Sequence, residues 1–114
     1  MPSKSQISSY WFPHLLKMGK LSDEENWCKT CFACSASNFF LFEDTENTIT
    51  LHRAHIFPKV LGGSDEVDNL HLLCQYCHLA SEYIYGTDYW AWFMKRNLMH
   101  TLQIYALQAN FSFK

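Results

Sequence analysis

The sequence predicts a single α+β domain, built around a cysteine-rich centre and flanked by an N-terminal arm and a C-terminal helix. The chain has 114 residues, of which 48% are hydrophobic and only 18% charged, so it can bury one compact core. Four of its five cysteines form two C-x-x-C pairs. Between and after these pairs, β-prone stretches are followed by segments with helical spacing. We expect one domain over residues 1–114. Within it, residues 1–27 form the arm and a short helix, residues 28–85 form the core, and residues 86–114 form the C-terminal helix.

The first 21 residues show no clean helical or strand period. Their apolar side chains, Trp11 and Leu15 among them, predict an arm that packs against the core. Ser22 and Glu25 then form the S-x-x-E pattern of a capping box, in which two side chains satisfy free backbone N–H groups at a helix start. A short helix is therefore expected over 23–29.

Strands are expected next. Two β-prone stretches, about 38–42 and 48–56, are joined by the polar turn 43–47, and this pattern predicts a hairpin. The segment 61–68 contains two adjacent glycines and predicts an irregular loop, after which ordered structure resumes at Asn69.

Two helices are expected in the last third of the chain. The first starts near Cys74 and ends at Gly86. Asp88 is placed to cap the second helix. The apolar side chains of the second helix recur at helical spacing, at Trp90, Met94, Leu98, Leu102 and Tyr105.

The two C-x-x-C pairs predict a structural zinc site. Each tight turn can direct two thiolates at one ion, and two such turns complete a tetrahedral set. The second pair is Cys74 and Cys77. Because Cys28 extends the first run to C-x-x-C-x-x-C, the first pair is either Cys28/Cys31 or Cys31/Cys34. We favour Cys31/Cys34, since the sequence FACS at 32–35 resembles a knuckle that leads into a strand.

The charge balance limits the classes of partner. Nine basic and eleven acidic residues give a formal net charge of −2, so the chain as a whole does not attract nucleic acid or an anionic membrane, and any such binding must be local. No apolar run approaches the roughly 20 residues of a membrane span, and the N-terminus lacks the apolar segment of a signal peptide. These features predict an intracellular protein without a membrane partner.

Between the cysteine pairs, order and spacing are specific. The chain reads LHRAHIFPK at 51–59, GGSD at 62–65 and DNLHLLCQYCH at 68–78. Together with the cysteines, residues 31–79 resemble the HNH endonuclease family, the ββα-metal nucleases with a four-cysteine zinc knuckle. The resemblance implies a small ββα-metal, treble-clef-like core that hydrolyses phosphodiester bonds in DNA, most simply double-stranded DNA.

The resemblance also implies a role for each motif residue. His55 matches the first histidine, which activates water, and its expected place at a strand end beside a loop suits that task because a neutral imidazole accepts a proton near physiological pH. Asn69 matches the middle residue, which ties the loop to the strand. His78 matches the last residue, which ligates the catalytic divalent cation, Mg²⁺ or Mn²⁺.

The chain departs from the family pattern at Ala54. This position usually supplies a second metal ligand, and an alanine side chain cannot coordinate an ion. Side chains two apart on a strand share a face, so His52 can reach the cation from the same side. Arg53 and Lys59, which flank His55, are the basic residues expected to meet nucleic-acid phosphates.

Two other functions remain open at this point. The missing ligand at Ala54 and the acidic net charge also fit a zinc-knuckle module that binds nucleic acid or protein with little or no catalysis. The apolar flanks further allow a homodimer, or an accessory protein that a partner recruits through them.

Overall fold

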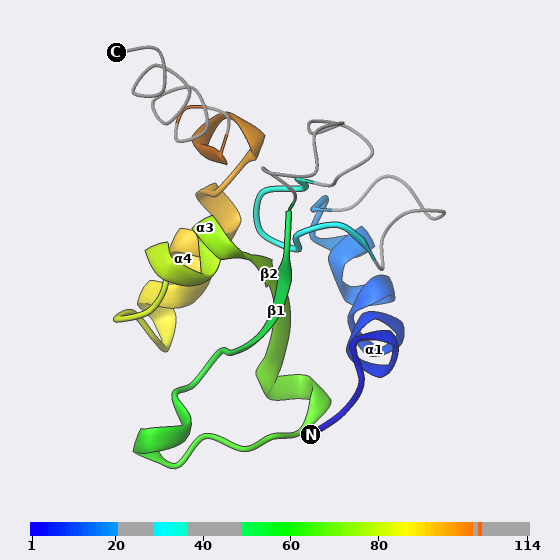
Figure 1. Ribbon diagram of the computed structural model, residues 1–114, viewed down its shortest axis with the longest axis vertical. Coiled ribbons are helices and arrows are strands. Elements are labelled where there is room, and N and C mark those ends of the chain that lie inside the picture. Colours follow the sequence, from blue (N-terminus) through cyan, green and yellow to red (C-terminus); the bar gives the residue numbers. More distant parts are fainter. Residues whose placement is uncertain (21–28, 37–48, 102, 104–114) are drawn as a thin grey trace.

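The computed structural model describes residues 1–20, 29–36, 49–101 and 103, in which a two-stranded sheet lies between helices (Figure 1). The strand expected at 38–42, its turn, and all but the last residue of the helix expected over 23–29 lie outside these ranges. No helix in the part of the chain described is long and apolar enough to cross a membrane.

The sheet is formed by β1 (Leu51–His55) and β2 (Leu70–Cys74), which run antiparallel with His55 opposite Leu70. β1 lies inside the predicted stretch 48–56. β2 is a strand that the sequence pattern did not predict. All five of its residues are buried, so they form a continuous apolar run that lacks the alternation by which a half-buried strand is recognised.

The loop between the strands contains two short 3₁₀ turns, η3 (Lys59–Leu61) and η4 (Val67–Asn69). Gly62 ends η3 in the left-handed region, with a φ of 99°, where glycine is at little disadvantage. Next to it, Gly63 passes so close to the backbone that an added Cβ would lie 1.9 Å from the carbonyl oxygen of Phe57. The glycine pair therefore sets the tight path of this loop.

The N-terminal arm packs against the core as expected, but it is a regular helix, α1 (Lys4–Lys17), which the sequence analysis did not predict. Ser3 and Gln6 form a capping box at its start, the pattern that predicted a helix elsewhere in the chain. Ile7, Trp11 and Leu15 recur every four residues and are buried. The Trp11 indole N–H donates to the Val67 carbonyl (2.8 Å), which ties the helix to η4.

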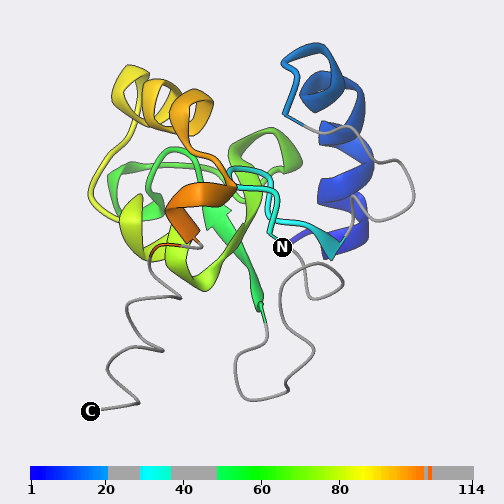
Figure 2. The same ribbon diagram turned by 90° about the horizontal axis from the view of Figure 1, so that it is seen from above.

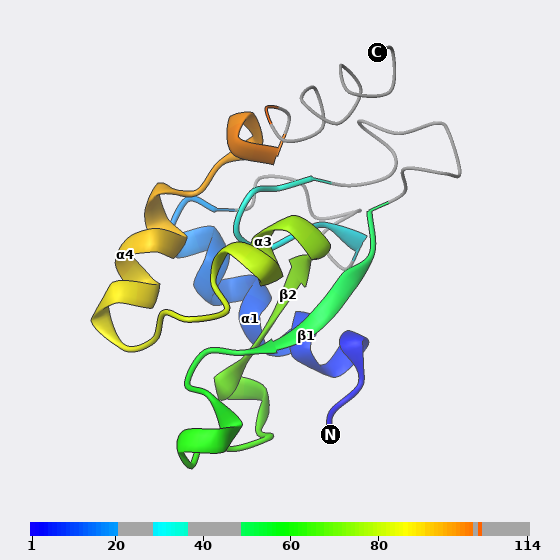
Figure 3. The ribbon, with the colours of Figure 1, turned by 60° about the vertical axis from the view of Figure 1, so that its left-hand side comes forward.

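The two later helices are shorter than predicted. The first, α3 (Gln75–Ala80), begins directly after β2 and lies against both strands (Figure 3). The second, α4 (Thr87–Lys95), has Gly86 at its N-cap position, and Asp88 lies in its first turn instead of capping it. Residues 98–101 are helical again, so the single long helix expected here is interrupted at Arg96, whose backbone is extended.

At the interruption the chain makes both local and tertiary hydrogen bonds. Locally, the Asn97 side chain accepts from the Met99 N–H, and the Asn97 N–H donates to His100 Nδ1, which caps the next helical turn. The Lys20 ammonium donates to the carbonyl oxygens of Phe93 and Arg96, both at 2.7 Å, and to that of Ala33 at 2.6 Å. These bonds satisfy carbonyl groups that a continuing helix would use internally.

The core lies around β2, with α1 on one side of the sheet and α3 and α4 on the other (Figure 2). His71 of β2 is fully buried among aromatic rings, stacked on Phe93 with 4.5 Å between ring centres. Its Nδ1 lies 2.6 Å from the Tyr89 hydroxyl. Burial lowers the pKa of His71 to about 3, so the ring is neutral in the folded protein near neutral pH.

Candidate metal centre and active-site cleft

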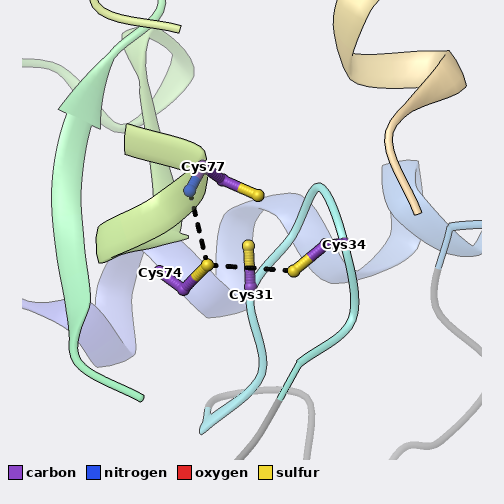
Figure 4. A group of neighbouring side chains, drawn as sticks. All are labelled: Cys31, Cys34, Cys74 and Cys77. Atoms are coloured by element: carbon purple, nitrogen blue, oxygen red, sulfur yellow. Dashed lines mark hydrogen bonds between the residues drawn. The ribbon is translucent and has the colours of Figure 1, made fainter. Parts of the chain in front are cut away.

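The cysteine pairs meet in a single cluster. The sulfur atoms of Cys31, Cys34, Cys74 and Cys77 all lie within 4.8 Å of one another, and all four residues are buried (Figure 4). The first pair sits on a turn in which the Ser35 N–H donates to the Cys31 carbonyl, and Ser35 has a positive φ of 69°. The Phe32 N–H donates to the Leu72 carbonyl, which holds this turn against β2. Cys28, the alternative ligand, lies outside the described residues.

The donor set fits a tetrahedral zinc ion. Sulfurs about 2.3 Å from a tetrahedral zinc lie roughly 3.8 Å apart, and the Sγ atoms of Cys34 and Cys74 are separated by 3.8 Å. Burial raises the pKa of the Cys31 thiol. Burial therefore disfavours the negatively charged thiolate unless a cation lies beside it. A divalent ion bound by all four sulfurs would stabilise the thiolate form.

Two cationic side chains flank this cluster. The Arg96 Nε–H points to the Cys77 sulfur at 3.4 Å. Burial lowers the pKa of Lys20, while the nearby thiolates of Cys31, Cys77 and Cys34 oppose that shift. Both cations offset the negative charge that four thiolates leave on a bound zinc ion.

His52 and His78 come together from β1 and α3. Their Nδ1 atoms are 2.8 Å apart, so one neutral ring donates a hydrogen bond to the other. Burial, and then the neighbouring His52, lower the pKa of His78. Both effects favour the neutral imidazole, which is the form that binds metal ions.

His55 occupies the end of β1, where the strand enters the loop. Its Nε2 lies 2.8 Å from Oδ1 of Asp65, and 19% of its side-chain surface is exposed. The other carboxylate oxygen of Asp65 accepts a hydrogen bond from the Lys59 ammonium, also at 2.8 Å. Hydrogen bonds from Lys59 and His55 lower the pKa of Asp65 to about 2, so this group is a carboxylate at neutral pH.

Asn69 ties both ends of the loop together. Its Oδ1 accepts from the Phe57 N–H (2.9 Å), and its Nδ2 donates to the Phe57 carbonyl (3.1 Å) and to the Ser64 carbonyl (2.8 Å). The Ile56 N–H also donates to the Asn69 carbonyl. One side chain therefore fixes the backbone next to His55 and next to Asp65.

His55 and His78 face one open cleft between the loop and α3. Its volume is about 190 Å³. The cleft is lined by His55, Pro58, Lys59, His78, Ser81, Glu82 and Ile84. Imidazoles from two different elements are thus available to one small ligand.

The predicted nucleic-acid contacts are engaged within the chain. Arg53 donates to the Pro2 carbonyl at 3.1 Å, and Lys59 pairs with Asp65. Both side chains belong to exposed residues, and Lys59 lines the cleft. Ala54, between His52 and His55, is 4% exposed and packs in the core.

Asp65 is the residue at this site that the sequence analysis missed. The sequence GGSD at 62–65 predicts an irregular loop and assigns no role to its acidic residue. The available signal was the tight turn itself, because two adjacent glycines bring the chain back toward Lys59 and the strand end.

The comparison with protein families bears on this same segment. Residues 42–83 match the family model described as HNH endonuclease. This segment is therefore similar to the HNH endonuclease family. The match contains Asn69, the two cleft histidines His55 and His78, and His52, but only the second cysteine pair. Neither the search of curated proteins nor that of solved structures gave a match.

The HNH match and the cysteine cluster confirm the predicted family and the small ββα-metal core, which consists of β1, β2 and α3. An HNH domain indicates a nuclease-type or otherwise nucleic-acid-related function.

Proposed function

We propose that this protein is a metal-dependent endonuclease that hydrolyses phosphodiester bonds in DNA. The observation that carries the proposal is the convergence of His55 and His78 on one open cleft, with His52 in contact with His78. A phosphodiester resists hydrolysis because water is a poor nucleophile and the transition state gathers negative charge. A base and a cation are both needed at one phosphate.

His55 is the proposed base. Its imidazole removes a proton from a water molecule in the cleft, and the water oxygen attacks phosphorus. The bond to the 3′ oxygen breaks, and that oxygen takes up a proton from solvent, which leaves 5′-phosphate and 3′-hydroxyl ends. Asn69 keeps the loop backbone in place so that the imidazole retains its position during the step.

His78 and His52 are the proposed protein ligands of the catalytic cation. Mg²⁺ or Mn²⁺ bound here would neutralise charge on the phosphate and on the leaving oxygen. His52 replaces the ligand that Ala54 cannot provide, because His52 lies on the same strand as Ala54 and its ring contacts His78. Magnesium commonly retains several waters, so two protein ligands suffice.

The test uses zinc-loaded protein with supercoiled plasmid, linear duplex and single-stranded DNA, in the presence of Mg²⁺ or Mn²⁺. We expect cleavage by wild type, a loss of about 100-fold or more in His55→Ala, and no cleavage by zinc-loaded wild type when Mg²⁺ and Mn²⁺ are omitted. His14→Ala is the matched control, since His14 is an exposed histidine on α1, and no residue of α1 lines the cleft. Equal cleavage by wild type and His55→Ala would refute the base.

The His52 assignment has its own measurement. His52→Ala should raise the Mn²⁺ concentration needed for half-maximal rate while leaving zinc content unchanged. An unaltered metal dependence would remove His52 from the ligand set and leave His78 with water and phosphate.

A second candidate function is nucleic-acid binding without cleavage. The buried Ala54 favours it, because its side chain cannot ligate a catalytic cation. It predicts DNA binding in a filter or gel-shift assay that His55→Ala leaves intact, together with no metal-dependent cleavage by wild type.

A further inference from the structure

The loop that lines one wall of the cleft contains a charged side chain, Asp65, that has no role in the reaction described above. Asp65 places one carboxylate oxygen 2.8 Å from His55 Nε2 and the other 2.8 Å from the Lys59 ammonium. Among the described residues, the second ring nitrogen of His55, Nδ1, has no hydrogen-bond partner. The two nitrogens of the proposed base therefore have different surroundings.

The contact determines which nitrogen of the neutral ring carries the proton. A carboxylate only accepts hydrogen bonds, so a bond at 2.8 Å requires a proton on Nε2. In a neutral imidazole the other nitrogen is then an acceptor with a free lone pair.

The position of the carboxylate is itself fixed. The Ser64 carbonyl, one residue before Asp65, accepts from the Asn69 side chain at 2.8 Å. Gly63 packs against the Phe57 backbone with no room for a Cβ. Lys59 holds the far oxygen, so the carboxylate is held by groups on both of its sides.

We propose that Asp65 is a positioning residue that fixes the tautomer of His55, so that Nδ1 is the nitrogen that receives the proton from water. The inference rests on the proposed function of His55 as a base. During the step the O–H bond of water breaks and its proton binds Nδ1, while Nε2 keeps its own proton. The imidazolium that forms continues to donate to the Asp65 carboxylate, which stabilises the new positive charge.

Other charged and titratable groups line the same cleft, namely Lys59 on the loop and His78 and Glu82 on the opposite wall. None of these is hydrogen-bonded to His55 in the part of the chain described. Asp65 is therefore the group to alter.

The first measurement reads the tautomer directly and needs no activity. Nitrogen-15 spectra of the histidine rings are recorded on zinc-loaded protein at a pH where His55 is neutral, and the His55 signals are assigned by their absence in His55→Gln. We expect the Nε2–H form in wild type and a mixture of both forms in Asp65→Asn, because an amide can either donate or accept. Asp68→Asn is the control: it makes the same chemical change in an exposed residue of the same loop and should leave the spectrum unchanged.

The second measurement is steady-state cleavage. Asp65→Asn should lower kcat about 10- to 100-fold with KM nearly unchanged, since substrate binding does not require the carboxylate. Asp65→Glu, which restores the charge, should recover part of the rate. Asp68→Asn should cleave like wild type.

The outcomes separate the two proposals. If wild type shows the Nδ1–H form, or if Asp65→Asn leaves the tautomer unchanged, the positioning role is refuted whatever the activity. If the Nε2–H tautomer is fixed but the protein cuts no DNA, the endonuclease proposal is refuted. The effect of Asp65 on the tautomer of His55 would still stand. A higher KM with an unaltered kcat in Asp65→Asn would also overturn the proposal.

Discussion

Cys77 and His78 are neighbours on α3, yet they belong to two centres of opposite character. Cys77 is fully buried and faces three other sulfurs, while His78 faces an open cleft with one histidine beside it. Successive residues on a helix point about 100° apart, which lets one short helix serve both centres. The cysteine cluster is closed and complete, as structural zinc sites are.

The cleft differs in what its residues are free to do. His55 is partly exposed, and the Nδ1 atoms of His52 and His78 face each other at 2.8 Å. The difference teaches that stability and chemistry are separated in this domain: changes at the sulfurs should unfold it, and changes at the imidazoles should leave it folded.

The largest effect is expected from the cysteines. Cys77→Ser, or removal of zinc by a chelator, should abolish cooperative folding, because structural zinc contributes about 10–16 kcal/mol in small zinc domains. Circular dichroism melting and zinc analysis measure this. A chelated, zinc-free protein that still melted cooperatively at an unchanged temperature would contradict the structural role of the cluster.

Acid should produce the next largest effect, through His71. Its pKa is lowered to about 3 in the folded state, whereas an unfolded histidine titrates near 6.5. The unfolded chain therefore binds the extra proton first, and stability present above pH 6.5 is lost as pH falls toward 3. The full loss amounts to about 5 kcal/mol, at about 1.4 kcal/mol per pKa unit.

Zinc is also released in acid, so the quantity to measure is a difference. Urea unfolding of wild type and His71→Leu should be compared from pH 7.5 to pH 4.5, with zinc content followed in parallel. Wild type should lose more stability with each unit of pH than the variant. Parallel curves for the two proteins would show that His71 does not carry the acid sensitivity.

A smaller loss is expected at the loop. Asn69→Ala removes three side-chain hydrogen bonds to Phe57 and Ser64 and should cost about 1–3 kcal/mol. Amide hydrogen exchange should rise in residues 56–66 and stay unchanged in α1. Faster exchange in α1 as well would mean that Asn69 supports the whole core and not only the loop.

The smallest effect on stability is expected at His78, which directly follows Cys77, where the largest effect is expected. His78→Ala removes a partly exposed ring and its single contact with His52, so it should change the free energy of unfolding by less than about 1 kcal/mol. Unfolding in urea with full zinc content checks this beside Cys77→Ser. Similar destabilisation of both variants would break the separation between the two centres.

Much of the metal centre could be predicted from the sequence because its signal is local. Two C-x-x-C pairs each define a turn, and the structure brings Cys31 and Cys34 to Cys74 and Cys77. The motif likewise indicated His55, Asn69 and His78, and the structure places His55 and His78 on one cleft, with Asn69 tying the loop beside it. Their chemical roles remain predictions.

What the sequence analysis missed depends on contacts between distant segments. β2 is buried on both faces, so it shows no alternation, and its partner lies across a loop of 14 residues, 56–69. At the break after Lys95, Lys20 donates to the Phe93 carbonyl, 73 residues away in the sequence. The helix α1 was missed for a different reason, since its Ser3–Gln6 cap is a local signal, while Pro13 inside it argues against a helix.

The HNH match begins at residue 42, after the first cysteine pair. A fragment trimmed to the matched segment would keep every cleft histidine and lose half of the sulfurs, along with Lys20 and the turn that pairs with Leu72. The smallest self-sufficient piece of this protein must therefore reach back at least to Cys31, well beyond the boundary that sequence similarity draws.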